Sequence, residues 1–140
     1  MFKIAVIPGD GIGPEVIAEG IKVLEALSDI ESIPMELEFF DIGSERYLKT
    51  GELLTEKDIN RLEEFQAIYF GAIGDPRVPP GVLEKGILIA MRTAFDQYVN
   101  LRPSKSWHPY TPLKGDKDFD ITFLRENTED FYMGAGGNLK

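Results

Sequence analysis

The feature that most constrains this sequence is a short apolar run that stops at a glycine-rich turn, with a helical pattern directly behind it. The run covers residues 3–7, and the segment PGDGIGPE follows it. β-Branched residues that stop abruptly at glycines are typical of a buried parallel strand. Behind the turn, Pro14 suits the first position of a helix, and Glu15 suits the positive end of the helix dipole. The pattern predicts a strand, a tight turn and a helix, which is the repeating unit of an α/β fold.

The predicted helix carries one apolar stripe and is expected to end near Ser28. Residues three or four positions apart share a face of a helix, and here they are Val16, Ile17, Ile21, Leu24 and Leu27. We expect this stripe to pack against the sheet.

Further apolar runs alternate with helical patterns along the chain. Strands are predicted at residues 35–40, 67–72, 98–101 and 121–124, and helices at residues 44–49, 55–65 and 82–95. Gly51 is placed to end the first of these helices, and Thr55 with Asp58 resembles a capping pair for the second. Such alternation predicts an α/β fold with a mostly parallel sheet flanked by helices.

The composition excludes several classes of function. The chain has 140 residues, of which 43% are hydrophobic, so it is long enough to bury a core. Its net charge of −9 argues against nucleic acid or a membrane surface as a partner, and a small molecule fits better. The apolar run at residues 3–7 is too short for a signal peptide or a membrane span, so we expect a cytoplasmic protein.

A metal site of the usual Cys/His kind cannot be assembled, because the chain has no cysteine and one histidine, His108. Any metal would need carboxylate oxygens. The acidic candidates follow no Ca²⁺-loop spacing and include Asp75, Asp96, Glu126 and Glu129. No residue is therefore assigned to a metal.

Ligands of open α/β sheets bind beyond the carboxyl ends of the strands. The segments GDGIGPE and GAIGDP follow the first and third predicted strands, and Arg102 and Arg125 follow the last two. The dinucleotide fingerprint GxGxxG fails, because Gly9, Gly11 and Gly13 come at every second residue. The glycines predict either a ligand-binding turn or only a tight strand-to-helix connection.

Three arginines, Arg92, Arg102 and Arg125, stand near the ends of apolar segments. Because an arginine fork pairs two-point with a carboxylate, three that converge would hold a dianionic or trianionic substrate. Three separate surface arginines are the alternative. Tyr132 could donate a proton if a neighbouring cation lowered its pKa, although an ordinary buried tyrosine is the alternative there.

Four segments together carry a family resemblance: IPGDGIGPEV, AIYFGAIG, MRTAFDQYVNLRPSK and FLRENTEDFYMG. They resemble the β-decarboxylating dehydrogenases, which include isopropylmalate, isocitrate, homoisocitrate and tartrate/D-malate dehydrogenases. The likeness runs over essentially the whole chain in the family's order and implies an isopropylmalate-dehydrogenase-like fold. The FDQYVNLRP wording and the DPRVPPGVLEKG loop look closest to the tartrate/D-malate branch.

The resemblance implies oxidation of a small 2-hydroxy dicarboxylic acid with NAD or NADP and a divalent Mg²⁺ or Mn²⁺. By motif, the family's substrate-carboxylate residues match Arg92, Arg102 and Arg125. The tyrosine that protonates the enol matches Tyr132. The segments that line the nicotinamide pocket match Ile12, Ala72 and Ile73.

Family members are more than twice as long as this chain. The resemblance implies that residues 1–99 form half of the first, cofactor-side domain and residues 100–140 the start of the second. It also implies that the catalytic lysine, the metal-binding aspartates and most of the adenosine-binding loop lie elsewhere, so we expect an inactive isolated chain that is completed as a homodimer or by another chain. The alternative is a truncated, non-catalytic module that binds a dicarboxylate or a protein.

Overall fold

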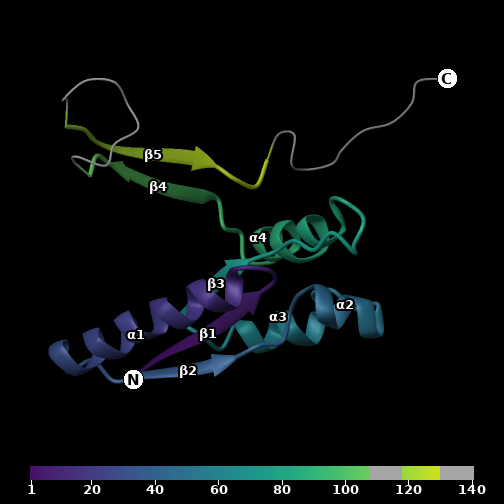
Figure 1. Ribbon diagram of the computed structural model, residues 1–140, viewed down its shortest axis with the longest axis horizontal. Coiled ribbons are helices and arrows are strands. Elements are labelled where there is room, and N and C mark those ends of the chain that lie inside the picture. The colour runs from purple at the N-terminus through teal and green to yellow at the C-terminus, as the bar shows by residue number, and fades with distance from the viewer. Residues whose placement is uncertain (108–117, 130–140) are drawn as a thin grey trace. The chain divides into compact units, whose positions relative to one another are not determined.

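A computed structural model describes residues 1–107 and 118–129 and divides the chain into two compact units, Met1–Met91 and Arg92–Lys140 (Figure 1). The first unit contains β1 (Phe2–Gly9), α1 (Gly13–Glu31), β2 (Met35–Phe39), α2 (Ser44–Thr50), α3 (Glu56–Leu62), β3 (Ala67–Ala72) and the π-helix η1 (Glu84–Ile89). The second contains β4 (Val99–Lys105) and β5 (Asp120–Glu126), and α4 (Ala90–Ala94) crosses the boundary. In the described segments no helix is long and apolar enough to cross a membrane.

The first unit is built on a parallel sheet of order β2-β1-β3, as the alternation of strands and helices predicts (Figure 1). Ile4 of β1 pairs with Leu37 on one side and with Ala67 on the other. The central strand is buried from Ile4 to Ile7. An apolar run such as residues 67–72 predicts a buried strand, but this prediction is wrong for β3, whose residues are half-buried or exposed. Among the described strands β3 pairs with β1 alone, which leaves its other side uncovered.

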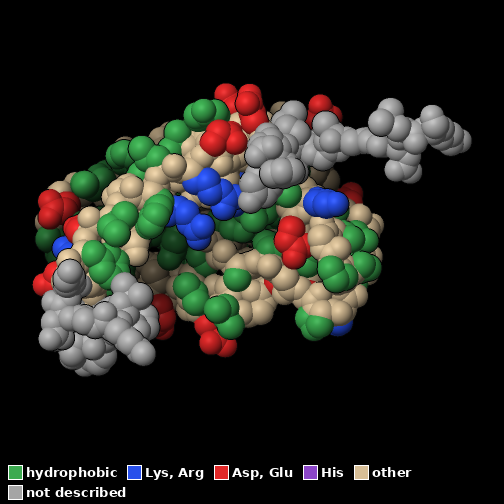
Figure 2. Space-filling model, turned by 90° about the horizontal axis from the view of Figure 1, so that it is seen from above, with side chains coloured by type: hydrophobic (Ala, Val, Ile, Leu, Met, Phe, Trp, Pro, Cys, Tyr) green, Lys and Arg blue, Asp and Glu red, His purple; other side chains and the backbone are tan. Residues whose placement is uncertain are grey.

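Helix α1 packs on β1 and β3. It contributes the buried Ile17 to the core, and its half-buried Ile21 and Leu24 pack against that core. The rest of the predicted stripe is wrong, because Val16 is 54% exposed and Leu27 is 42% exposed. A residue one position along a helix is turned by about 100°, so Val16 cannot share the face of Ile17. Figure 2 shows hydrophobic side chains open to solvent beside acidic ones on the face that it draws.

Local sequence signals correctly place the end of α2 and the start of α3. Gly51 ends α2 with φ 76°, a left-handed conformation that glycine adopts without strain. Thr55 caps α3, and its hydroxyl accepts a hydrogen bond from the Asp58 backbone N–H while the Asp58 carboxylate accepts one from the Thr55 backbone N–H. The predicted capping pair is confirmed, although α3 ends at Leu62 and not near Phe65.

The Asp58 carboxylate makes α3 sensitive to acid. Burial alone would raise the pKa of Asp58, but hydrogen bonds from Arg46, at 2.8 Å, and from Thr55 outweigh burial and hold the pKa below its usual value. A carboxyl whose pKa is lower in the folded state stabilises the fold above its unfolded pKa, and this stabilisation is lost as the pH falls. We therefore expect Asp58→Asn to cost about 1 kcal/mol of unfolding free energy at pH 7 and almost nothing below about pH 3.

Urea unfolding of both proteins between pH 2 and pH 7 measures this difference. Asp29→Asn, at an exposed position of α1, is the matched control and should leave the pH dependence unchanged. A difference between Asp58→Asn and the unaltered protein that stays constant with pH would contradict the assignment.

The helix predicted at residues 82–95 is observed as η1 followed by α4. The buried side chains of this segment, Leu83, Ile87 and Met91, are four positions apart, and residues at that spacing lie on one face of a helix. The Leu54 backbone N–H donates to the Gly86 carbonyl at 3.3 Å and joins η1 to the segment before α3.

The second unit contains an antiparallel pair, β4 and β5, in which Leu101 lies opposite Leu124 (Figure 1). The predicted ends of these strands are wrong, because β4 continues to Lys105 and β5 to Glu126. Arg102 and Arg125 therefore lie within strands and not beyond their carboxyl ends. An antiparallel pair can keep one face in water, so polar residues continue the strands where the apolar run has stopped.

Candidate functional site

Arg102 and Arg125 lie on the same face of the β4–β5 pair. Arg102 is opposite Phe123, and Arg125 is opposite Asn100. Because Asn100 and Arg102 are two positions apart on β4, the two arginines are diagonal neighbours across the strands. Diagonal neighbours have Cα atoms about 7–8 Å apart, within reach of long side chains. The register therefore brings together two of the three predicted arginines.

A cavity of about 830 Å³ opens at this pair. Its lining contains Arg102, Pro103, Ser104, Phe123, Leu124, Arg125 and Glu126. Backbone N–H groups of Thr128 and Glu129 donate to the Glu126 carboxylate and, together with the Thr128 hydroxyl, outweigh burial, so the pKa of Glu126 is lowered. Glu126 thus stays ionised, and its carboxylate is hydrogen-bonded to the turn that follows β5. The cations in the lining of the cavity are the guanidinium groups of Arg102 and Arg125.

The third predicted arginine, Arg92, is half-buried on α4. Its carbonyl accepts a hydrogen bond from the Gln97 backbone N–H at 2.9 Å. The buried side chain of Asn127 donates to the Gln97 carbonyl at 3.3 Å, and its amide oxygen lies 3.4 Å from the donor amide nitrogen of Asn100. Asn127 therefore links the turn that follows Arg92, at Gln97, to the strands that carry the other two arginines.

The nicotinamide residues that the family resemblance implies lie in the first unit, where the loops after β1 and β3 meet. The chain passes from β1 to β2 on one side and then to β3 on the other, so the sheet has its topological switch point between β1 and β3, where α/β sheets bind ligands. Ile12 is 67% exposed, and Ala72 and Ile73 are half-buried. A Cβ at Gly9 would lie 3.3 Å from the Ile73 side chain.

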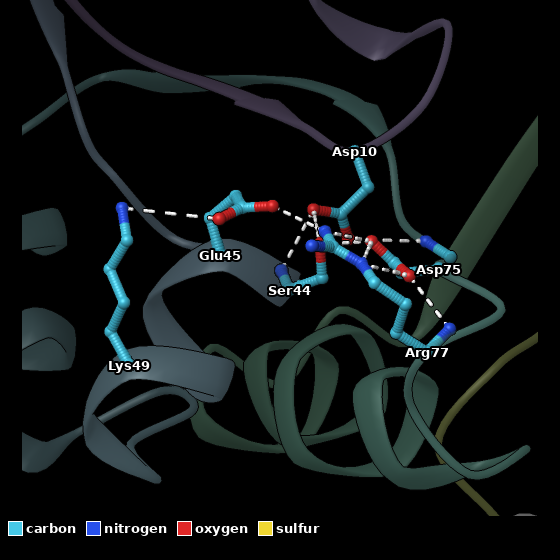
Figure 3. Close-up of polar contacts among 7 residues, drawn as sticks. Asp10, Ser44, Glu45, Lys49, Asp75 and Arg77 are labelled. Atoms are coloured by element: carbon cyan, nitrogen blue, oxygen red, sulfur yellow. Dashed lines mark hydrogen bonds and ion pairs between the residues drawn. The ribbon is translucent and has the colours of Figure 1, made fainter.

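A polar network joins these two loops to the start of α2 (Figure 3). The Asp10 carboxylate accepts hydrogen bonds from the Ser44 backbone N–H at 2.8 Å, the Ser44 hydroxyl at 2.7 Å and the Gly74 backbone N–H at 3.2 Å. The Ser44 hydroxyl also lies 3.0 Å from Asp75. Arg77 hydrogen-bonds to Asp75 and holds the pKa of that carboxyl well below its usual range.

Sequence reasoning missed Asp10, Ser44 and Asn127. The one available signal for Asp10 was a carboxylate between two glycines directly after a buried strand. Tyr132 and His108 lie outside the described residues, so the role of Tyr132 as a proton donor stays a prediction.

The two implied cofactors fit the described residues differently. At the switch point a Cβ at Gly74 would have no atom within 4 Å, and one at Gly11 would only reach the Gly74 carbonyl oxygen at 4.0 Å, so the surface at these two glycines, beside the exposed Ile12, is open. For a metal, no three acidic or histidine residues within 1–107 and 118–129 converge. The described residues therefore leave open surface where the resemblance implies a nicotinamide, but they do not form a metal site.

The fold is that of a dehydrogenase family. The family model for isocitrate/isopropylmalate dehydrogenase matches residues 3–139, and the chain belongs to that family, which confirms the predicted resemblance. It is 51% identical over 140 residues to a 3-isopropylmalate dehydrogenase of Streptomyces coelicolor and 52% identical over 141 residues to one of Corynebacterium diphtheriae. These alignments cover 99% of this chain and 40% of each relative.

The fold class is confirmed by a solved structure. An isocitrate dehydrogenase from Methylococcus capsulatus superimposes with a TM-score of 0.81 at 28% identity, over 100% of this chain and 39% of that protein. The chain thus spans about 40% of the length of the relatives that it matches.

Proposed function

We propose that this chain supplies the substrate-carboxylate clamp and part of the nicotinamide pocket of an oxidative, decarboxylating dehydrogenase that acts on a 2-hydroxy dicarboxylic acid. The observation that carries the proposal is the diagonal pairing of Arg102 with Arg125 over a cavity of about 830 Å³. Two planar guanidinium groups at this separation can each grip one carboxylate of a small diacid through two hydrogen bonds. A single carboxylate would use only half of this arrangement.

The residues of this chain would bind and orient the substrate, and NAD or NADP, when bound, would supply the acceptor for the hydride of the substrate hydroxyl carbon. Arg102 and Arg125 fix both ends of the diacid, and Arg92 is proposed to hold a further carboxylate oxygen. Ile12, Ala72 and Ile73 present apolar surface to the nicotinamide face and exclude water from it. Tyr132 is proposed to donate the proton that the carbon needs after CO₂ leaves.

The described residues form no site for the Mg²⁺ or Mn²⁺ that the family implies, so no step is assigned to the metal. We propose that its ligands come from outside these residues and that the active assembly is a homodimer or is completed by another chain.

The relatives named above favour 3-isopropylmalate as the substrate. The FDQYVNLRP wording favours tartrate or D-malate instead. Both kinds of diacid present two carboxylates to the arginine pair, so the substituent between them decides the choice.

We expect the full-length protein to reduce NAD or NADP in the presence of Mn²⁺ and one 2-hydroxy diacid. The assay follows nicotinamide absorbance with 3-isopropylmalate, D-malate, tartrate and isocitrate, and lactate serves as a monocarboxylate control. The clamp predicts that kcat/KM for the best diacid exceeds that for lactate by a factor of about 10³ or more, because one arginine would lose its charged partner. Turnover of lactate as fast as of any diacid would overturn the proposal.

A further inference from the structure

The Asp10 carboxylate is unusual because it is buried without a cation. Asp10 is 6% exposed, and the donors to its carboxylate are two backbone N–H groups and one hydroxyl. In the part of the chain that the structure describes, no lysine or arginine forms an ion pair with it. Burying a carboxylate without a cation costs about several kcal/mol unless hydrogen bonds compensate. Asp10 therefore has a role for which a neutral apolar residue would not serve.

Asp10 hydrogen-bonds to the backbone on both sides of Ile73. Its backbone N–H donates to the Ala72 carbonyl at 2.6 Å, directly before Ile73. Its side chain accepts from the Gly74 N–H at 3.2 Å, directly after Ile73. Ile12 lies two residues beyond Asp10 itself, so one residue holds the loop of Ile73 against the loop of Ile12.

Ser44, at the start of α2, holds the Asp10 carboxylate in place (Figure 3). Both the N–H and the hydroxyl of Ser44 donate to the same carboxylate oxygen. Gly43 makes this approach possible, because a Cβ at that position would lie 2.7 Å from the carboxylate oxygen. The carboxylate has one oxygen anchored on α2 and the other on Gly74, so it cannot turn without breaking one of these contacts.

We infer that Asp10 is a positioning residue that sets the gap between Ile12 and Ile73 and thereby the affinity for the nicotinamide cofactor. The inference rests on the proposed function, in which these two isoleucines line the nicotinamide pocket. Asp10 itself is buried behind the loops and acts through their backbone.

The substitution Asp10→Asn separates this role from general support of the fold. An asparagine can turn its amide oxygen toward Ser44 and keep both of those hydrogen bonds. Its amide NH₂ then faces the Gly74 N–H, and two donors cannot bond to each other. The variant therefore releases Gly74 while the link to α2 remains.

Ser44→Ala is the matched control. It removes the hydroxyl contacts to Asp10 and Asp75 but keeps the Ser44 N–H donor and both contacts of Asp10 around Ile73. Each variant loses about one buried hydrogen bond, so comparable losses of stability are expected.

The test is a fluorescence titration of the full-length protein and of both variants with NADH and with NADPH, accompanied by hydrogen exchange of the segment that contains Gly74. We expect Asp10→Asn to raise the Kd of the preferred cofactor about five- to tenfold and to speed exchange at Gly74. Ser44→Ala should leave the Kd within about twofold and exchange at Gly74 unchanged. The KM for the diacid should stay within about twofold in both variants, since the arginine pair lies on other elements.

An unchanged Kd in Asp10→Asn, when the unaltered protein binds the cofactor, would overturn this inference and leave the proposed function standing. Equal rises in Kd for the two variants would reduce Asp10 to structural support. Unchanged exchange at Gly74 in Asp10→Asn would show that the carboxylate does not hold this loop. If the unaltered protein binds neither nucleotide, both the proposed function and the inference are wrong.

Discussion

Replacing Arg102 with alanine is expected to lower kcat/KM of the full-length protein toward its diacid by a factor of about 10² to 10⁴. The arginine fork is proposed to donate two hydrogen bonds to one carboxylate, and a hydrogen bond to a charged group is worth about 1.5–3 kcal/mol. A tenfold change in rate corresponds to about 1.4 kcal/mol, which gives the stated range. Steady-state kinetics with varied diacid measures the loss.

The chain offers two controls for this experiment. Lys105 is a cation of the same strand, but it lies three positions from Arg102 and hence on the opposite face, where it is paired with Asp120 at 3.7 Å. Lys105→Ala should change kcat/KM by less than about twofold. Arg102→Lys keeps the charge but loses the forked guanidinium group, so its loss of kcat/KM should fall between those of Arg102→Ala and Lys105→Ala. Normal rates for Arg102→Ala would remove Arg102 from the clamp.

The elements of this fold could be predicted from the sequence because their signals are local. The run at residues 3–7 was enough to predict β1, and Thr55 with Asp58 was enough to predict the start of α3. Strand ends were predicted less well, since an apolar run can stop while the backbone pairing continues. For this reason Arg102 and Arg125 were predicted to follow their strands, whereas the observed strands continue past both residues.

The site depends on pairings that no local signal contains. Arg102 and Arg125 share a face only because Asn100 lies opposite Arg125, and a shift of one residue would turn one arginine to the other face. Likewise, Asp10 contacts Ser44 and Gly74, which are 34 and 64 positions away. Residue types predicted which groups could bind carboxylates, but only strand register and loop packing determine which of them meet.

The glycine that ends β1 is expected to be among the least replaceable residues of the first unit. Gly9 has φ 73°, which costs an L-residue about 1–2 kcal/mol, and an added Cβ would overlap the Ala72 carbonyl oxygen of the neighbouring strand. Overpacking of this kind costs about 1–3 kcal/mol, so Gly9→Ala should lower the unfolding free energy by about 2–5 kcal/mol. The displaced carbonyl is also the acceptor of the Asp10 N–H, so the contact between the β1 and β3 loops would weaken too.

Gly51→Ala isolates the backbone part of this effect. Gly51 has φ 76°, nearly the same as Gly9, but an added Cβ there would meet no atom within 4 Å. Gly51→Ala should therefore cost only the backbone strain, about 1–2 kcal/mol, and urea unfolding of both variants measures the difference. If the two substitutions cost the same, the close approach of β3 contributes nothing, and the glycine after β1 is required only for its backbone conformation. A larger loss for Gly9→Ala would show that the close approach of β3 to the end of β1 itself stabilises the fold.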